Sequence, residues 1–504
     1  MMKRIIPRTV GALLSACALF ALSVPISSAQ TEFTQNAKYV NVRSHGAKGD
    51  ALSNDTAAIR AAVNAAKSGG KTVFFPAGVY RVSESIAVPA GVGLEGVTSA
   101  CNGPWQNLYD GEAKNVLYRN KGSSNYFDPE MNPGTWILAA NGSGNVDAGA
   151  TFQLGGGNSV RRLGFLNMFS PPINGEGAVP TPPVIGADIN KMTSAKGLEI
   201  EDISLTNPYF GIAVYQGSLK SYNTSAKLSG KGPGPVSISN VMGAAMYRGI
   251  SVIGVKDKVT LGNIQFNYAN YGSVYVKQHM NRCVDIDIAA SANVTVTNVL
   301  SYGALTGLQT SAAFSGSPVN LTARNLNLEG ERTLVMNASG THQISNSYLF
   351  LTNKASESKN WAAVIIRQDA ASAAKAVYNL TNIAFQDSIG DPSNPDFYVD
   401  ASVQGGAQIT LTNATMWNWS PSTNTPMIKF NHASGGASKF TVANLGLCSS
   451  RSGQLAAVSG DAYQPGELAF VGGRFPASVL GNVDTRIKFT NCTKADGGNT
   501  LFSN

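Results

Sequence analysis

Short runs of alternating apolar and polar residues recur along this chain and set its pattern. Between residues 160 and 446 one unit returns, made of a short alternating strand, an Asn or similar turn residue, and a second short strand. In chain order the unit reads VRRLGFLN, LEIEDISLTN, VSISNVM, VTLGNIQF, VTVTNVLS, LTARNLNL, HQISNSYL, YNLTNIAF, ITLTNATM and FTVANLGL. Period-two alternation is typical of β-strands, and a repeated unit at variable spacing indicates stacked coils with loops inserted at their corners.

The turn of most units is an Asn, and the spacings between these residues run from 21 to 36. Asn tolerates the left-handed backbone conformation that a sharp corner needs, and its amide can also bond to the Asn of the next coil. The predicted corner residues are Asn240, Asn263, Asn298, Asn325, Asn346, Asn382, Asn413 and Asn444.

The repeat predicts an all-β fold, a single-stranded right-handed parallel β-helix whose coils each contribute short strands to about three sheets. No coil can bury its apolar face alone, so roughly ten to twelve coils must stack. The apolar positions of the units predict a core of Ile203, Leu205, Ile238, Val241, Leu261, Ile264, Val296, Val299, Leu326 and Leu328.

One helix is expected, between residues 55 and 68. Asn54 or Asp55 can cap its first turn, six Ala favour a helix over the segment, and Gly69-Gly70 ends it. Ile59 and Val63 lie four apart and give the helix one apolar side. Because a stack of coils has an open apolar end, this amphipathic helix is expected to cap it.

Residues 39–97 contain HGAKGD, NDTAAIRAAVNAA, VFFPAGVYRV and VPAGVGLEG. These motifs closely resemble the start of the pectate-lyase-like domain, which rhamnogalacturonase-like, epimerase-like and phage tailspike-like β-helix proteins share. The resemblance implies the pectin-lyase-like form of the parallel β-helix and action on extracellular or envelope polysaccharide. It also implies capping roles, not catalysis, for Asp50 and Asp55.

Residues 1–29 are typical of a secretory signal peptide, with Lys3, Arg4 and Arg8 before an apolar run and small residues at 27–29. Cleavage near Ala29 predicts a secreted or periplasmic protein with no membrane insertion afterwards. The remainder, 30–504, is expected to be one β-helix domain, with an N-terminal cap motif at 39–97 and a C-terminal cap at about 450–504.

The composition limits the kinds of partner that the protein is expected to bind. Cleavage would remove three basic residues and no acidic ones, so the formal charge falls from +8 to +5. This modest positive charge suits an acidic polysaccharide as a partner. The sequence contains no basic run interleaved with aromatic residues, so it does not predict nucleic-acid binding. Four cysteines would remain in an oxidising compartment, and Cys448–Cys492 is the favoured disulfide, with Cys101 and Cys283 left as a pair or as buried thiols. The sequence leaves monomer and homotrimer open.

A further short strand follows each unit, and by analogy with the resembling fold these strands floor the substrate groove. Alternation predicts an outward-facing line of polar side chains along them. Its members are Tyr215, Tyr275, Lys277, Gln309, Asn337, Arg367, Asp400, Lys429 and Asn431. Trp417 and Trp419, two apart in MWNWSPST, are a candidate platform for stacking on sugar rings.

The densest cluster is YVKQHMNR, which holds Tyr275, Lys277, His279 and Arg282. With Arg367, these groups could neutralise a uronate carboxylate and remove the neighbouring proton, so they are candidate catalytic residues of a polysaccharide lyase. A lyase is therefore favoured.

Two alternatives stay open. A glycoside hydrolase needs two carboxyl groups flanking one bond, for which the candidates are Asp285, Asp287, Glu329, Glu331 and Asp400. Asp285 and Asp287 are expected on one side of a strand. The catalytic signatures of polygalacturonases, mannuronan epimerases and calcium-dependent pectate lyases are absent, which favours a non-catalytic glycan-binding or adhesin-like protein. No metal site is predicted, although scattered carboxylates could bind Ca²⁺.

Overall fold

The computed structural model describes the β-helix, except for parts of several segments that connect its strands. Contacts divide the chain into residues 1–36 and 37–504, and all described residues belong to the second unit. They are 38–99, 133–169, 179–206, 208–220, 234–267, 283–291, 293–311, 318–351, 362–367, 376–387, 397–403, 406–417, 426–432, 438–447, 455–460, 467–475, 480, 486–494 and 501–502.

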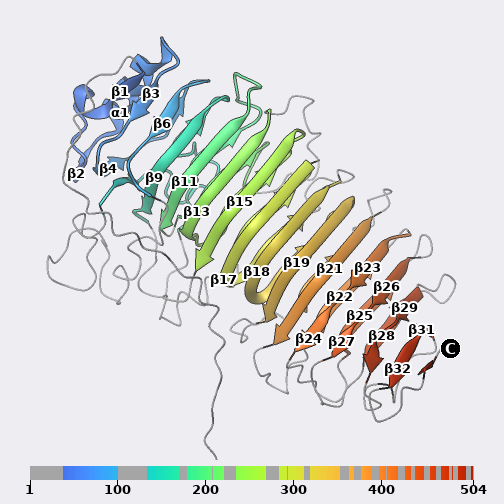
Figure 1. The fold of residues 1–504 in the computed structure, drawn as a ribbon. Helices are drawn as coiled ribbons and strands as arrows, with labels where there is room; N and C mark the ends of the chain where they lie inside the picture. The colour runs from blue at the N-terminus through green and yellow to red at the C-terminus, as the bar shows by residue number, and fades with distance from the viewer. Residues whose placement is uncertain are drawn as a thin grey trace, which may run out of the picture. The chain divides into compact units, whose positions relative to one another are not determined.

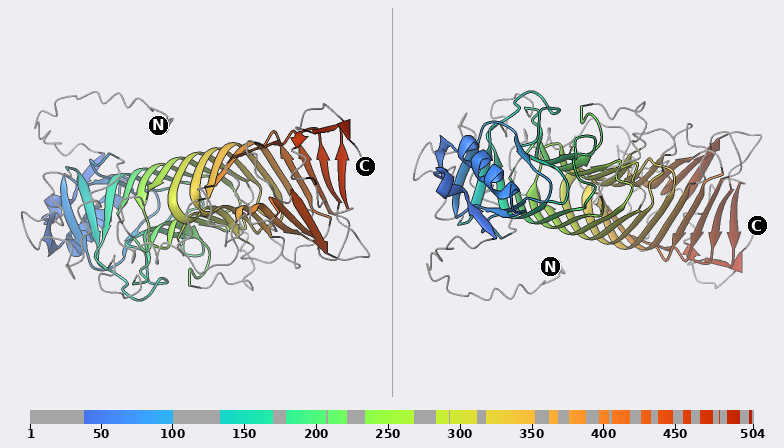
Figure 2. Two further views of the ribbon diagram at one scale, coloured as in Figure 1. Left: turned by 90° about the horizontal axis from the view of Figure 1, so that it is seen from below. Right: turned by 90° about the horizontal axis from the view of Figure 1, so that it is seen from above.

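Parallel strands stack coil upon coil throughout this unit (Figure 1). Each coil turns at a corner residue, which separates two sheets. Sheet 1 is formed by the strand segments before the corner, sheet 2 by the segments after it, and sheet 3 by the strands that follow and lead into the next coil. The three sheets enclose one core, as the two further views show (Figure 2), and the fold is the predicted right-handed parallel β-helix.

The first coils are built from short elements. They are β1 (Tyr39–Asn41), the 3-10 helix η1 (Val42–His45), β2 (Asp50–Asn54), α1 (Thr56–Lys67), β3 (Thr72–Phe74), β4 (Gly78–Val82), β5 (Ile86–Val88), β6 (Gly93–Glu95), β7 (Thr135–Ala139) and β8 (Phe152–Leu154).

In the middle of the stack single strands run around the corner, from sheet 1 into sheet 2. They are β9 (Ser159–Asn167), β11 (Leu198–Thr206), β13 (Val236–Ala244), β15 (Lys258–Asn267), β17 (Asn293–Ser311), β18 (Leu321–Met336), β19 (Thr341–Leu351) and β21 (Val377–Asp387). The ends of β17 and β18, from Thr306 and Arg332, continue into sheet 3.

The other strands of sheet 3 are β10 (Pro183–Asp188), β12 (Phe210–Tyr215), β14 (Arg248–Ile253), β16 (Val284–Ala289), β20 (Ala362–Arg367), β22 (Phe397–Val403), β25 (Ile428–His432) and β28 (Ala456–Gly460). Sheets 1 and 2 end with β23 (Gln408–Thr412), β24 (Thr415–Trp417), β26 (Lys439–Ala443), β27 (Gly446–Leu447), β29 (Glu467–Val471), β30 (Arg474–Phe475), β31 (Ile487–Thr490), β32 (Cys492–Lys494) and the antiparallel β33 (Leu501–Phe502). The predicted C-terminal cap, about 450–504, thus contains further coils.

The Asn corners are confirmed. All eight predicted residues have left-handed φ angles, between 51° and 56°, and Asn491 is a ninth. Their amides form a ladder along the stack: Nδ2 of Asn298 donates to Oδ1 of Asn263 at 2.9 Å, and Nδ2 of Asn325 donates to Asn298 at 3.1 Å. At these corners the turn is therefore stabilised both by its backbone geometry and by a hydrogen bond to the preceding coil.

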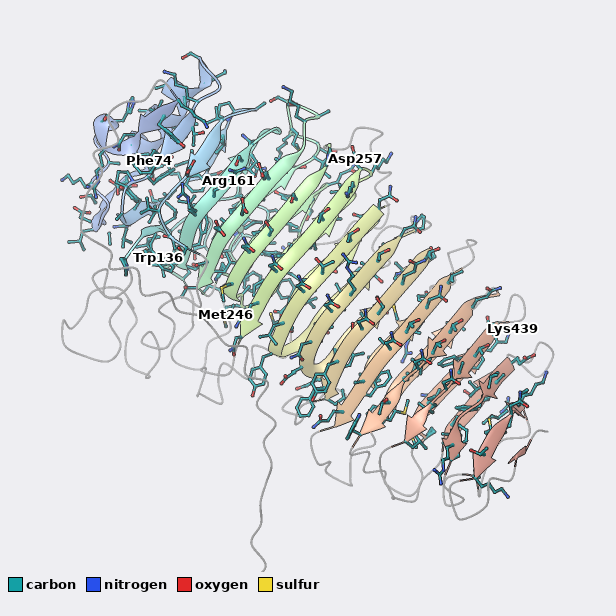
Figure 3. The ribbon with its side chains drawn as sticks, viewed as in Figure 1. Phe74, Trp136, Arg161, Met246, Asp257 and Lys439 are labelled. Atoms are coloured by element: carbon teal, nitrogen blue, oxygen red, sulfur yellow. The ribbon has the colours of Figure 1, made fainter. Side chains whose placement is uncertain are left out.

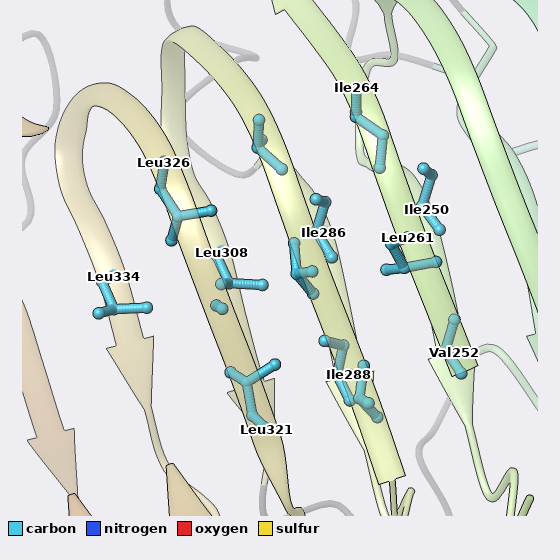
Figure 4. Packing of buried hydrophobic residues seen from close by; sticks show 14 of the residues in the cluster. Ile250, Val252, Leu261, Ile264, Ile286, Ile288, Leu308, Leu321, Leu326 and Leu334 are labelled. Atoms are coloured by element: carbon cyan, nitrogen blue, oxygen red, sulfur yellow. The ribbon is translucent and has the colours of Figure 1, made fainter. Parts of the chain in front are cut away.

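Apolar side chains from all three sheets meet in the core. Figure 4 shows Leu261 and Ile264 of β15 beside Ile250 and Val252 of β14, all within the enclosed space. All ten predicted core residues are buried. Because every described coil adds such residues to one continuous core, stability comes from stacking rather than from any single coil.

Helix α1 covers the N-terminal end, with Ile59 and Val63 fully buried in the core cluster. Of the two expected capping residues, Asn54 bonds to the first turn: its Oδ1 accepts the backbone N–H of Thr56. The Asp55 side chain instead accepts the N–H groups of Lys48 and Gly49 and makes no bond to the helix. Oδ1 of Asp50 accepts the backbone N–H groups of Leu52 and Ser53 and so stabilises that turn. Within the described residues, no helix is long and apolar enough to cross a membrane.

The favoured Cys448–Cys492 disulfide is wrong, because Cys492 is a buried thiol. Cys283 is also a buried thiol, which is one of the two outcomes expected for it. The Cys283 thiol donates to the carbonyl of Ala245 at 3.1 Å, and that of Cys492 lies against backbone carbonyls of its own and the preceding coil. Cys101 and Cys448 lie outside the described residues.

Candidate functional site

The outer face of sheet 3 carries a line of polar side chains across successive coils. In β16, Ile286 and Ile288 belong to the core, so Asp287 between them faces outward. The register places Asp287 beside Gln309, Gln309 beside Val335, Val335 beside Ile365, Ile365 beside Asp400, and Asp400 beside Lys429. Two residues further along the strands, the neighbouring outward line contains Ser311, Asn337, Arg367, Ser402 and Asn431.

A first cluster surrounds Asp287, which is fully buried although it faces outward. One carboxylate oxygen accepts Nε of Arg248 at 3.2 Å. The other accepts Nε2 of Gln309 at 3.2 Å and the hydroxyl of Ser311 at 2.8 Å. The Arg248 guanidinium also lies 4.0 Å from the ring centre of Tyr247. Both carboxylate oxygens of Asp287 thus accept hydrogen bonds from neighbouring side chains.

A second cluster lies four coils further along the same face. Nη2 of Arg367 is 2.5 Å from Oδ2 of Asp400, and its Nη1 donates to the Asp400 backbone carbonyl at 2.9 Å. Lys429 follows Asp400 in the register. Arg332 is near enough to Arg367 for the two charges to interact, and burial, with that repulsion, lowers the Arg332 pKa despite the opposing charge of Glu331.

Two acceptors in this second cluster have no partner within the described structure. Oδ1 of Asp400 and Oδ1 of Asn337 are both buried and accept no hydrogen bond there. Native proteins seldom leave buried acceptors unmatched unless a ligand, an ion or water completes them. This end of sheet 3 is therefore suited to receive hydroxyl or N–H donors.

The carboxylates predicted for a hydrolase are not brought together. Asp285 points inward, where it accepts the hydroxyl of Ser301 at 2.5 Å, so it does not share a side with Asp287. The prediction that both lie on one side was wrong, because Asp285 stands at the corner where its strand enters sheet 3. Asp287 and Asp400 are four strand spacings apart, about 19 Å.

The remaining carboxylates lie elsewhere. Glu329 belongs to sheet 2, in register with Tyr302, and Glu331 lies at the junction between the sheet 2 and sheet 3 parts of β18. Among the described residues, no three His, Cys, Asp or Glu side chains are grouped so that they could hold a metal ion.

The predicted substrate-binding residues divide into three groups. Gln309, Asn337, Asp400 and Lys429 lie on the outer face of sheet 3, together with the catalytic candidate Arg367. Tyr215 shares this face but is 4% exposed, and burial, followed by the charge of Asp188, raises its pKa well above the usual value. Trp417 lies on sheet 2 instead, in register with Gln386.

At this level sheet 3 is formed by β16, which begins at Val284 and pairs with β14 and β17. The strand predicted at 272–279 lies outside the described residues. The catalytic candidates Tyr275, Lys277, His279 and Arg282, and the platform residue Trp419, lie outside the described residues.

Sequence reasoning missed Arg248, Ser311 and Arg332 as members of the site. Arg248 and Arg332 are the first residues of their coils on sheet 3. Each lies next to a corner, so the sequence alone did not show that it is in register with the other outward residues of the sheet. For Arg248 the sequence did contain a signal. Its strand reads RGISVI, and the alternating core pattern begins only at Ile250, which leaves Arg248 outside the core.

Comparison with known proteins agrees with this architecture. The family model for rhamnogalacturonase A/epimerase, pectate lyase-like proteins matches residues 39–125. The fold and this match define a pectate-lyase-like parallel β-helix protein. The matched segment contains residues 39–97, so the resemblance that these residues carry is confirmed.

Curated relatives match over short segments. A glucan 1,3-beta-glucosidase of Cochliobolus carbonum is 40% identical over 70 residues, 14% of this chain and 9% of that protein. The mannuronan C5-epimerase AlgE5 and alginate lyase 7 of Azotobacter vinelandii are 61% and 59% identical over 44 residues, 8% of this chain and 4% and 5% of theirs. The chain therefore spans less than a tenth of the length of these relatives.

Solved structures match along most of the chain at low identity. The A-module of the A. vinelandii mannuronan C-5 epimerase AlgE6 is 13% identical with a TM-score of 0.45, covering 91% of this chain and 100% of that one. A family 28 exopolygalacturonase of Yersinia enterocolitica is 14% identical with a TM-score of 0.44, covering 92% of this chain and 79% of that one.

Proposed function

We propose that the protein binds an acidic polysaccharide along the outer face of sheet 3 and cleaves it by β-elimination. One observation carries the proposal: Arg367 and Lys429 lie beside two buried acceptors without partners, on Asn337 and Asp400. A uronate residue offers hydroxyl donors for these two acceptors, and its carboxylate can join that of Asp400 beside Arg367.

The repeat of the fold supports a polymer as the ligand. Successive side chains on sheet 3 are spaced by one strand, about 4.8 Å, over many coils. An extended glycan presents a similar group at intervals close to the length of one sugar residue. The outward positions from Asp287 to Asn431 can therefore contact several sugars, through polar groups at both ends of the line and through Val335 and Ile365 between them.

A lyase fits the described side chains better than a hydrolase. A hydrolase needs two carboxyl groups about 5–10 Å apart, one of them protonated. Asp287 and Asp400 are much farther apart, and each is paired with an arginine. For elimination, Arg367 and Lys429 would neutralise the uronate carboxylate, which makes the neighbouring C–H more acidic.

The proton acceptor is assigned among basic or phenolic groups. Lys429 can serve if the ligand approaches it, and Tyr275, Lys277, His279 and Arg282 remain candidates from the sequence. Relatives named as an alginate lyase and as mannuronan epimerases support an acidic glycan as the substrate class. The expected export after cleavage near Ala29 would place the protein where such polymers occur.

A non-catalytic glycan-binding role is the second candidate. It is favoured by the mutual pairing of charges on sheet 3, where Arg248 holds Asp287 and Arg367 holds Asp400. A face whose ionic groups are already engaged can position a ligand without transforming it.

The test uses purified residues 30–504 with a panel of acidic and neutral polysaccharides, with and without calcium. Unsaturated uronate absorbance and new reducing ends are followed together. The proposal expects both to rise on an acidic polymer. Reducing ends without absorbance would indicate hydrolysis, and retention on a glycan without either product would indicate the binding role.

A matched pair of variants locates the activity. Lys429→Ala, on sheet 3, should lower turnover by at least about tenfold, the effect of losing one contact worth about 1.4 kcal/mol in the transition state. Lys439→Ala removes the same side chain from the exposed surface of β26 in sheet 1, where Lys439 is labelled in Figure 3, and should leave turnover unchanged. Equal loss in both variants would refute the assignment to sheet 3.

A further inference from the structure

The outer face of sheet 2 carries a second line of side chains, which the proposed function does not use. The register aligns Tyr302 with Glu329, Glu329 with Phe350, Phe350 with Gln386, and Gln386 with Trp417. An aromatic ring thus recurs at every second coil, with a carboxyl or amide group between. We call these five residues the aromatic column.

The rings of the column are accessible and one part of it is fixed in place. Tyr302 is 37% exposed and Trp417 is 49% exposed, unusual values for large apolar side chains in this protein. Tyr348 stacks on Phe350 with ring centres 6.2 Å apart and nearly parallel planes. Its hydroxyl donates to Oε1 of Gln386 at 2.6 Å, so the middle of the column is preorganised.

A groove runs along the same face and reaches the column. Its volume is about 710 Å³. It is lined on four successive strands by Met242, Gln265, Leu300 and Asn327, and along its edge by the corner residues Asn240, Asn263, Asn298 and Asn325. Leu300 and Asn327 lie two residues before Tyr302 and Glu329 on the same face, and Asn327 pairs with Tyr348.

The edge of the groove repeats a hydrogen-bond donor. Each corner amide has two donor hydrogens, and the ladder bond to the preceding coil uses one of them. Donors, rings and amides therefore recur with the period of the coil, about 4.8 Å or its double. This period is close to the length of a sugar residue in an extended chain, and aromatic faces stack on the apolar side of sugar rings.

The charge of the surface distinguishes its ligand from that of sheet 3. The column contains no Lys or Arg, and its ionisable carboxyl, Glu329, has a pKa raised by burial. A polyanion would find no cation here, whereas a neutral glycan needs none. We propose that the groove and the aromatic column form a binding track for a neutral polysaccharide chain, separate from the acidic-polymer face of sheet 3.

The test measures retention on neutral glycans. Wild-type residues 30–504 are run on native gels with embedded mixed-linkage β-glucan or xylan, and pulled down with insoluble cellulose and β-1,3-glucan. Tyr302→Ala/Trp417→Ala should weaken retention on at least one of these polymers about tenfold or more, since two exposed rings are lost. Tyr302→Phe/Trp417→Phe keeps both rings and should retain most of the binding.

Controls separate this site from the fold and from sheet 3. Leu52→Ala removes an exposed apolar side chain near the N-terminal cap and should change nothing, and circular dichroism checks that all variants fold. Lys429→Ala should bind neutral glycans normally. The proposal is overturned if wild type is retained by none of the four polymers, or if the double alanine variant binds as wild type does. It is also overturned if light scattering shows that the column mediates self-association.

Discussion

Sheets 2 and 3 offer two outer faces on the same coils, and their chemistry differs. On sheet 3 the outward positions hold arginines, a lysine and carboxylates, and two acceptors are left without partners. On sheet 2 the corresponding positions hold rings and amides beside an open groove. Because apolar side chains supply most of the coil interior, the outward residues can vary without disturbing the stack, and one scaffold can present two unlike surfaces.

The largest expected effect is on stability, from the buried ion pair of sheet 3. Asp287→Ala leaves Arg248 buried without its counter-ion and should destabilise the fold by about 3–5 kcal/mol. Asp257→Ala, at an exposed turn, is the matched control and should change little. Thermal unfolding of both variants measures the difference. Similar midpoints for the two would show that Asp287 is not a structural anchor of this face.

The next effect is functional and sets the two faces against each other. Arg367→Ala should lower turnover of an acidic polysaccharide by at least about tenfold, while retention on neutral glycans stays unchanged. The Tyr302→Ala/Trp417→Ala variant should show the reverse. The comparison fails if either variant impairs both activities, since the faces would then form one site.

A smaller effect concerns the ladder that borders the sheet 2 groove. Asn298→Ala places at φ 56° a residue that adopts this left-handed conformation less readily than Asn, and it removes two ladder bonds. The free energy of unfolding should therefore fall by about 1–2 kcal/mol. Asn298→Gly loses the same bonds without the backbone penalty and should be milder. Equal destabilisation by Ala and Gly, measured by denaturant melts, would assign the corner's role to the amides alone.

The smallest effect is a pH dependence at Glu329. Burial raises its pKa, so the folded state favours the protonated carboxyl. The resulting stability is present below the unfolded pKa of about 4.3 and is lost as the pH rises through the folded pKa. Glu329→Gln should therefore raise the melting temperature at neutral pH and have little effect near pH 4, about the unfolded value. A gain that is the same at both pH values would contradict this.

The coil interior could be predicted from the sequence because it follows simple rules. Alternation identified the core, and the Asn residues identified the corners, since few other residues accept a left-handed φ. It was harder to predict from the sequence which segments form the strands of sheet 3. The segments at 272–279 and 284–289 both alternate, and nothing local in the sequence shows that the second, β16, pairs with β14 and β17.

The site was predictable only in part for the same reason. Gln309, Arg367, Asp400 and Lys429 were placed correctly because their strands follow regular units. Asp285 was misplaced, because the side that a residue faces at a corner depends on where the turn ends. A one-residue difference there reverses the side, and only the pairing register determines it.

The most direct test of the account is a structure of the protein with an acidic oligosaccharide of several residues bound. The account predicts a chain lying along sheet 3, with a uronate carboxylate on Arg367 and Lys429 and hydroxyl groups donating to Oδ1 of Asn337 and Asp400. An oligosaccharide bound along the aromatic column of sheet 2, with sheet 3 empty, would contradict it.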